Sequence, residues 1–325
     1  MTNAGVAAPA YASLAGASMG TTWTVKFNAQ GVDLPRLKHG IPAALDEIVA
    51  QMSTWDDDSA ISSLNRAEPG WYQLPAAFFK VLAQALKLAE TTDGAYDPTV
   101  GALVDLWGFG SKGALDSPPP AAAVADALAH CGWRRTALDA EHCAVWQPGG
   151  MHFDLSSIAK GYGVDVIGRV LEEAGVTDYL AELGGELKAG GLNPARKPWA
   201  LDIETPVPNP ERVPIVLNNL AIATSGDYRR YFIHQGRRYA HTIDPRLGAP
   251  ISGKLASVSV IHPHCMMADG LATALLALGS DKGMAYAQRH NIAALFMSRH
   301  EHDVAIAWSD EFAKCAGADT SSPCS

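Results

Sequence analysis

Asp269 and Thr273 have the residue types and the spacing that catalysis on a phosphate group would use. They stand four residues apart in a segment with helical periodicity, so their carboxylate and hydroxyl share one helical face. Hard oxygen ligands of this kind suit Mg²⁺, which takes few protein ligands and keeps water or substrate phosphates. The alternative is an ordinary pair of polar side chains on an exposed helical face.

His241 is a second candidate, because it stands directly before the turn Thr-Ile-Asp-Pro-Arg at 242–246. The ordinary pKa of histidine lies near neutral pH, so this side chain could act as a general base. The alternative is a surface histidine at the end of a strand.

The stretch FDLSSIAKGYGVD at 153–165 is a third candidate. Asp154, Ser156 and Ser157 precede a helical run that begins near Lys160. The unpaired N–H groups at a helix start can bind an anion, and Lys160 could neutralise a phosphate. The alternative is a serine N-cap followed by a surface lysine. Together the three candidates indicate metal-assisted phosphoryl chemistry on a nucleotide.

Composition excludes several other classes of protein. The chain has 325 residues with 25 Lys and Arg against 34 Asp and Glu, a net charge of −9, which argues against nucleic acid as the partner. No apolar run is long enough to span a membrane. The five cysteines have no zinc or disulfide spacing, which favours free thiols and a reducing compartment. The first residues lack the basic region of a secretory signal, so we expect a cytoplasmic protein, or a periplasmic one if a signal has been removed.

Periodicity predicts the elements that must position these residues. Apolar residues recur every three or four positions in the expected helices, at 34–52, 74–90, 98–110, 121–131, 160–171, 266–278 and 281–290. Short β-prone runs predict strands at 23–27, 136–139, 143–147, 151–155, 179–183, 186–191, 200–204, 213–217, 220–225, 228–234, 238–243, 255–261, 292–297 and 304–308. We expect residues 1–17 to be a flexible leader, 18–310 a single catalytic domain and 311–325 a flexible tail.

Three local patterns leave alternatives open. The acidic run at 56–58 could bind a metal or could be a solvated capping segment. Trp107 and Phe109 could line a cleft for a planar ring or could be core residues. The pair Gly184-Gly185 between two strands could allow close approach of a ligand or could mark a β-bulge.

Nine motifs, in order along the chain, carry a resemblance to a known family. They are MGT at 19–21, MSTW at 52–55, SAISSLN at 59–65, GAYDPTVGALVDLWGFG at 94–110, DLSSIAKGYGVD at 154–165, ELGGELKAGG at 182–191, ATSGDYRRYF at 223–232, HTIDPRLGAP at 241–250 and ADGLATALLALG at 268–279. From about residue 19 to 310 the chain resembles the FAD:protein FMN transferase (ApbE-like) family.

The resemblance implies an enzyme that splits FAD with Mg²⁺, joins FMN through a phosphoester bond to a Ser or Thr of an acceptor flavoprotein, and releases AMP. It implies an α+β fold of antiparallel sheets flanked by helices, with two lobes around a central FAD cleft. His241 matches the base, and Asp269 also belongs to the catalytic set. The flavin-contacting positions carry over to Met19, Trp55, Ala95, Tyr96, Asp97, Asp154, Lys160 and Ile243, and the metal positions to Ser157 (through its backbone carbonyl), Asp269, Ala272 (through its backbone) and Thr273.

The chain departs from the family pattern at three positions. Trp55 replaces a common tyrosine, Glu186 a usual aspartate and Leu247 a usual threonine. Two other functions stay open from the residues alone. One is an Mg²⁺-dependent FAD pyrophosphatase that releases free FMN and AMP, and the other is a flavin carrier without enzymatic activity.

Overall fold

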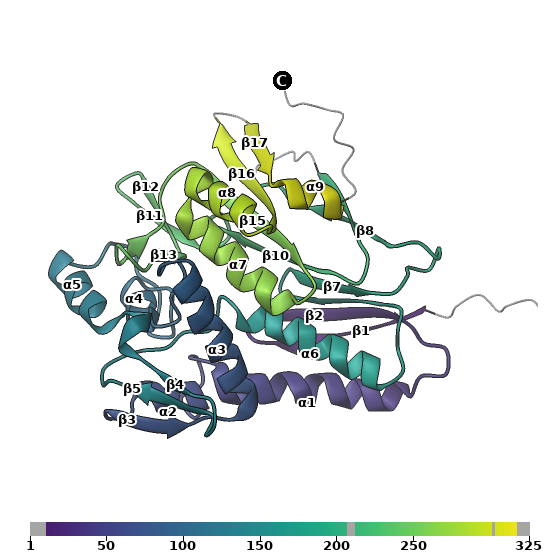
Figure 1. Ribbon diagram of the computed structural model, residues 1–325, viewed down its shortest axis with the longest axis horizontal. Helices are drawn as coiled ribbons and strands as arrows, with labels where there is room; N and C mark the ends of the chain where they lie inside the picture. The colour runs from purple at the N-terminus through teal and green to yellow at the C-terminus, as the bar shows by residue number, and fades with distance from the viewer. Residues whose placement is uncertain (1–10, 207–211, 301–302, 317–325) are drawn as a thin grey trace, which may run out of the picture.

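An antiparallel sheet of eight strands forms the centre of the molecule (Figure 1). The structure is a computed structural model and describes residues 11–206, 212–300 and 303–316. The strands lie in the order β1 (Tyr11–Ser18), β2 (Thr21–Asn28), β6 (Tyr179–Leu183), β7 (Glu186–Gly190), β10 (Ala221–Gly226), β15 (Leu255–His262), β16 (Ala293–His300) and β17 (Asp303–Trp308). The prediction of antiparallel sheets flanked by helices is confirmed, whereas the division into two lobes stays a prediction.

Helices cover one face of this sheet (Figure 1). They are α1 (Leu34–Met52), α6 (Ala159–Glu173), α7 (Cys265–Leu278) and α8 (Ser280–Arg289), and α3 (Ala76–Thr91) packs on α1 and α7. The predicted apolar stripe of α1 is buried as expected, from Leu37 to Met52. Apolar residues of these helices form one continuous core with the inward side chains of the sheet, because each amphipathic helix must bury its apolar face.

A hairpin and a short helix cover part of the other face. The hairpin consists of β8 (Trp199–Ile203) and β9 (Val213–Leu217), and the helix is α9 (Asp310–Ala316). Trp199, Leu217 and Phe312 form a second apolar cluster with side chains of the sheet. Because both of its faces are covered, β15 is buried along almost its whole length.

Smaller elements gather around α3, at the left of the view in Figure 1. The sheet β3-β5-β4 and the hairpins β11–β12 and β13–β14 belong to this group. A third apolar cluster joins Trp107 and Phe109 to the β11–β12 hairpin. The elements are α2 (Ala60–Asn65), β3 (Gly70–Gln73), α4 (Gly101–Leu106), α5 (Ala121–His130), the 3₁₀ turn Trp133–Arg135, β4 (Leu138–Asp139), β5 (Ala144–Gln147), β11 (Tyr231–His234), β12 (Arg237–Ala240), β13 (Ile243–Asp244) and β14 (Ala249–Pro250).

The predicted flexible ends are wrong where the structure describes them. Residues 11–17 form most of β1, which pairs along its full length with β2. In the predicted tail, 311–316 belong to α9, whose Phe312 is almost completely buried. Residues 1–10 and 317–325 lie outside the described residues. In residues 11–17 and 311–316, long-range pairing or packing supplies the order that the local sequence does not indicate.

Three local predictions are also corrected. Residues 151–155 form no strand, and only His152 makes an isolated bridge. Neither Ser156 nor Ser157 caps α6, because the N-cap position is Ile158 and carries no side-chain cap. Gly184-Gly185 is a tight turn between β6 and β7 with positive φ at both residues, so it is not a β-bulge.

The contact between α6 and α7 fixes the relative positions of Lys160, Asp269 and Thr273. Asp165 of α6 accepts hydrogen bonds from the first backbone N–H groups of α7, those of Cys265 (3.1 Å) and Met266 (3.0 Å). Its carboxylate also pairs with Lys188 at 3.1 Å. One turn earlier, the Gly161 N–H donates to Asp269 Oδ2 at 2.9 Å. Three charged or polar contacts therefore set both the spacing and the register of the two helices.

No helix among the described residues is long and apolar enough to cross a membrane. The four cysteines within the described residues are free thiols.

Gly161→Ala should lower the free energy of unfolding by about 1–3 kcal/mol, the range for overpacking a core. A Cβ at Gly161 would lie 2.4 Å from the Cys265 carbonyl oxygen and 2.8 Å from Asp269 Cβ. Urea unfolding checks this. The control is Gly40→Ala in α1, whose Cβ would meet only Val170 at 3.5 Å and should raise stability by up to about 1 kcal/mol. Equal effects of the two variants would contradict the proposed close packing at Gly161.

Candidate active site

A cavity of about 990 Å³ opens where the start of α6, the middle of α7, the β6–β7 turn and the β12–β13 link meet. All predicted site residues except Ala272 line it. These are Met19, Trp55, Ala95, Tyr96, Asp97, Asp154, Ser157, Lys160, His241, Ile243, Asp269 and Thr273. Ala272 is fully buried in α7 and does not line the cavity, so its predicted role as a metal ligand stays a prediction.

Asp269 and Thr273 face the cavity from α7, as their spacing predicts. Asp269 is only 3% exposed, and burial raises the pKa of its carboxyl, while the nearby Lys160 ammonium lowers it in part. Asp269 Oδ2 is held by the Gly161 N–H, and Thr273 Oγ1 lies 2.8 Å from Ser225 Oγ. The exposed-pair alternative is therefore excluded for Asp269, since its carboxylate is buried and fixed.

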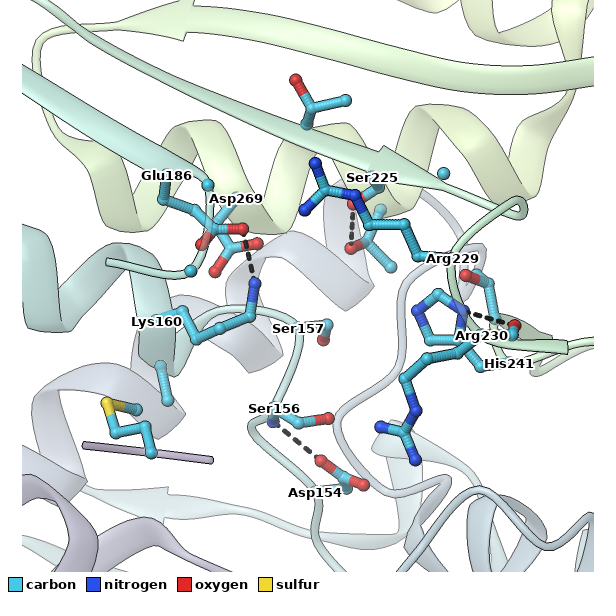
Figure 2. A pocket seen from close by; sticks show the side chains of 18 of the residues that line it. Asp154, Ser156, Ser157, Lys160, Glu186, Ser225, Arg229, Arg230, His241 and Asp269 are labelled. Carbon is cyan, nitrogen blue, oxygen red and sulfur yellow. Dashed lines mark hydrogen bonds and ion pairs between the residues drawn. The ribbon is translucent and has the colours of Figure 1, made fainter. Parts of the chain in front are cut away.

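Lys160 occupies a more constrained position than the sequence indicates. Its Nζ lies 2.5 Å from Glu186 Oε1 (Figure 2). Burial alone would lower the pKa of Lys160, but the carboxylates of Asp269 and Glu186 outweigh it and raise that pKa. Lys160 is thus a cation that is already paired inside the protein. A phosphate that binds Lys160, as predicted, would have to compete with Glu186 for the ammonium group.

Glu186 is 2% exposed, and its Oε2 atom has no hydrogen-bond partner in the described part of the chain. Burial raises the pKa of its carboxyl to about 7, against the opposing effect of Lys160. A buried carboxylate oxygen without a hydrogen-bond partner is uncommon in folded proteins, and here it belongs to a residue that lines the cavity. The sequence marks this position only as a departure from the family pattern.

His241 is held by the backbone of the preceding hairpin. Its Nδ1 lies 3.2 Å from the carbonyl oxygen of Arg230, and its backbone N–H donates to the same oxygen at 3.1 Å. A carbonyl can only accept, so Nδ1 carries the proton and Nε2 carries the lone pair. Burial lowers the pKa of His241 to about 4, and the charge of Arg230 adds to the effect. The imidazole is therefore neutral at pH 7 and able to accept a proton.

The segment 95–99 is braced by Asp97. Asp97 Oδ1 accepts from the N–H and the hydroxyl of Thr99 (2.9 and 2.7 Å), and Oδ2 accepts from the Trp133 N–H (3.0 Å). The loop presents Tyr96, whose hydroxyl accepts from Ser157 Oγ at 3.1 Å. Burial raises the pKa of Tyr96, so this hydroxyl stays protonated.

Asp154 closes a local turn at the other end of the cavity. Its Oδ1 accepts from the Ser156 N–H at 2.7 Å (Figure 2). Burial is the largest cause that raises the pKa of this carboxyl. Met19 and Trp55 belong to the same cavity: Met19 has φ +52 in the tight β1–β2 turn, and Trp55 is 62% exposed. An exposed indole at the cavity wall is free to stack on a planar ring.

The two alternatives for Trp107 and Phe109, cleft residue or core residue, each apply to one of them. Phe109 lines the cavity, whereas Trp107 is a core residue that donates through Nε1 to the Gly248 carbonyl at 2.9 Å. The acidic run at 56–58 forms a local turn in which Asp56 Oδ1 accepts from the Asp58 N–H. Leu247, another departure from the family pattern, is 69% exposed and does not line the cavity.

The sequence did not single out Ser225, Arg229 or Arg230 as site residues. Figure 2 shows the two arginines diverging from adjacent positions, Arg229 toward the Asp269 side and Arg230 toward Asp154. The signal available to sequence reasoning is the motif SGDYRR itself, which places a hydroxyl and two cations within six residues.

The oxygen donors on α7 fit a hard divalent cation that takes some of its ligands from the protein and the others from a substrate. It offers the Asp269 carboxylate, whose Oδ1 has no protein hydrogen bond in the described residues, and the hydroxyl of Thr273. No group of three or more His, Cys, Asp or Glu side chains in the described ranges could hold a metal by itself. Mg²⁺ tolerates this arrangement, because it typically binds through one or two carboxylates plus phosphates and water.

Comparisons with known proteins agree with this geometry. The sequence model of the ApbE family matches residues 19–296. The chain is 39% identical over 313 residues to the FAD:protein FMN transferase of Haemophilus influenzae, covering 93% of this chain and 90% of that one. The apo structure of the flavinyl transferase ApbE of Pseudomonas stutzeri superimposes with a TM-score of 0.88 at 35% identity, over 95% of this chain and 98% of that one. The flavin transferase ApbE of Vibrio cholerae gives a TM-score of 0.87 at 36% identity, over 94% and 99%.

His241 should titrate with a pKa of about 4. Because burial disfavours the imidazolium, its ring signals should stay constant from pH 7 downward and move only near pH 4. NMR of the histidine Cε1–H signals checks this, and the signal is assigned by its loss in His241→Gln. Titration of that signal at pH 6.5 or above would contradict the half-buried, neutral imidazole.

Proposed function

We propose, from the premise that this chain belongs to the ApbE family, that it is an FAD:protein FMN transferase. It cleaves FAD, attaches FMN to a serine or threonine hydroxyl of an acceptor flavoprotein and releases AMP. The single observation that carries the proposal is the convergence of His241, Asp269 and the Tyr96–Asp97 loop on one cavity.

His241 has the state that a general base needs. Its Nε2 lone pair is free of the Arg230 carbonyl, and its low pKa keeps it neutral at working pH. In the reaction the acceptor hydroxyl oxygen forms a bond to the phosphorus of the FMN half. The bond from that phosphorus to the oxygen of the AMP phosphate breaks, and the electron pair leaves with AMP. The hydroxyl proton passes to His241 Nε2.

Asp269 and Thr273 are the residues that would hold Mg²⁺, which when bound neutralises negative charge on the pyrophosphate. The protein supports these ligands through contacts already formed. The Gly161 N–H fixes one oxygen of Asp269, and Ser225 fixes the Thr273 hydroxyl. Ser157 lines the same cavity from the turn before α6, so the predicted contribution of its backbone to the metal stays part of this proposal.

The flavin half of FAD would occupy the part of the cavity lined by Met19, Trp55 and the 95–97 loop. Trp55 offers an exposed ring for stacking on the isoalloxazine. Asp154, Lys160 and Ile243 are the other predicted contacts. Phe109 adds an aromatic wall that the resemblance did not assign.

The experiment that tests the proposal is co-expression of this chain with candidate flavoproteins, followed by mass spectrometry of the acceptors. An FMN-mass adduct on Ser or Thr that requires this chain supports the transferase. Release of FMN and AMP at the same rate with and without acceptor would instead support a pyrophosphatase. Bound FAD with no turnover in Mg²⁺ would support a flavin carrier.

Asp269→Asn should reduce Mg²⁺-dependent FMN transfer by roughly 10²-fold or more, the range for removing one charge-stabilising group. The amide oxygen still accepts from the Gly161 N–H, so the fold should persist. Transfer rates over a Mg²⁺ titration measure the effect, with thermal unfolding as the control. Full transfer by Asp269→Asn or Asp269→Ala at ordinary Mg²⁺ concentration would be incompatible with this carboxylate as a metal ligand.

His241→Ala should retain FAD binding and lose transfer by roughly 10²–10⁴-fold, the contribution typical of a general base. The imidazole contacts the Arg230 carbonyl, whereas the proposed flavin contacts are other residues of the cavity. The affinity for FAD should therefore change little. Flavin fluorescence measures binding, and adduct formation measures turnover. An unchanged turnover would rule out His241 as the base.

A further inference from the structure

The cavity that would receive FAD has an excess of negative charge. Six carboxylate side chains line it against three cationic ones, not counting His241. The carboxylates are Asp97, Asp154, Glu186, Asp202, Glu204 and Asp269, and the cations are Lys160, Arg229 and Arg230. The pyrophosphate of FAD carries two negative charges of its own. Its binding therefore depends on which cations are free to face it.

Two of the three cations are engaged by a buried carboxylate or by a backbone carbonyl. Lys160 pairs with the buried Glu186 and stands beside Asp269. Arg230 donates through Nη2 to the Phe109 carbonyl at 3.0 Å and points toward Asp154, whose carboxyl pKa it lowers in part (Figure 2). Neither can turn to a ligand without leaving a buried or backbone partner.

Arg229 is different, because its partner is a solvent-exposed carboxylate. Its Nη2 lies 2.8 Å from Glu204 Oε2, and the two side chains are 59% and 73% exposed. Glu204 stands just after β8, on the rim opposite the β10–β11 corner that carries Arg229. An exposed ion pair of this kind is weak, since water screens both charges. The pyrophosphate of FAD, with one negative charge on each phosphate, competes with it effectively, because Arg binds phosphate oxygens in a bidentate manner.

The surroundings of Arg229 leave space for that exchange. The guanidinium extends across the cavity toward the side that carries Glu186 and Asp269 (Figure 2). It borders the Gly184-Gly185 turn, where a Cβ at Gly185 would lie 3.5 Å from Nη1. Gly185 also has φ +105, so both its conformation and its missing side chain keep the backbone beside the guanidinium uncovered.

We propose that Arg229 binds the pyrophosphate of FAD by exchanging its ion pair with Glu204 for the phosphate oxygens. The inference rests on the proposed function, because FAD supplies the phosphate. Arg229 then offsets part of the negative charge that the six carboxylates impose on the cavity. Glu204 acts as a competing partner that holds the guanidinium at the rim until FAD arrives.

The alternative is that the pair is a structural bracket between β8 and the β10–β11 corner. The two accounts predict opposite signs for one variant. If Glu204 competes with FAD for Arg229, Glu204→Gln strengthens FAD binding. If the ion pair instead holds the wall of the cavity together, Glu204→Gln and Arg229→Gln both weaken FAD binding.

The test is the dissociation constant of FAD, measured by flavin fluorescence in EDTA and again in Mg²⁺. Arg229→Gln should weaken binding by roughly ten- to hundredfold, the range for a hydrogen bond to a charged group. Glu204→Gln should strengthen it by about two- to fivefold, the range of an exposed ion pair. In the double variant the gain from Glu204→Gln should disappear.

Matched controls separate this exchange from a general change of charge. Asp202→Asn removes the same charge from a neighbouring cavity residue, but its partner Arg212 does not line the cavity, so its effect should be smaller than that of Glu204→Gln. Arg238→Gln removes a cation that lies over Tyr231 outside the cavity and should leave FAD affinity unchanged.

Weaker binding in both Glu204→Gln and Arg229→Gln would overturn the proposal, as would a gain from Glu204→Gln that persists without Arg229. Unchanged affinity in Arg229→Gln would overturn it equally. Failure of the wild-type protein to bind FAD in either buffer would instead contradict the proposed function.

Discussion

The hydrogen bond from the Gly161 N–H to Asp269 Oδ2 is the contact on which the candidate active site depends. It joins two helices whose sequences lie over a hundred residues apart, and it is possible only because residue 161 has no side chain. Asp165 repeats the connection one turn later by capping α7. With both contacts in place, Lys160 on α6 and Asp269 on α7 face the same cavity. The packing of α6 on α7 therefore sets the relative positions of the charged groups in the candidate active site.

Burial of charge is the second constraint, and it acts on nearly every functional group. Burial raises the carboxyl pKa of Asp154, Glu186 and Asp269, and it lowers that of the His241 imidazole. Each buried carboxylate is compensated by a hydrogen bond or a cation, because an unpaired buried charge is strongly unfavourable. A cavity built in this way has few spare cations. A phosphate-bearing substrate must bring positive charge with it or displace an existing partner.

Much of the site could be predicted from the sequence, because its residues lie in ordered motifs with characteristic spacing. The one-turn separation of Asp269 and Thr273 and the helix after Lys160 follow from local periodicity alone. The partner of Lys160 does not, since Glu186 reaches it through the β6–β7 hairpin and the packing of α6 on the sheet. The segment 11–18 is rich in small residues and has little strand propensity, and its pairing with β2 makes it a strand. Phe312 orders α9 for a similar reason, since the apolar surface that buries it comes from distant strands. Residues 151–155 show the reverse error, because a short buried apolar run resembles a strand even where no neighbouring strand pairs with it.

The central claim is that α6 and α7 together form one site for the metal and the FAD pyrophosphate. The most direct measurement is a crystal structure of the protein with FAD and Mn²⁺ in place of Mg²⁺, with anomalous scattering used to locate the metal. The account predicts one Mn²⁺ peak in contact with Asp269 and the Thr273 hydroxyl, with FAD phosphate oxygens completing its coordination. A Mn²⁺ peak away from α7, or FAD phosphates bound outside the cavity between α6 and α7, would contradict it.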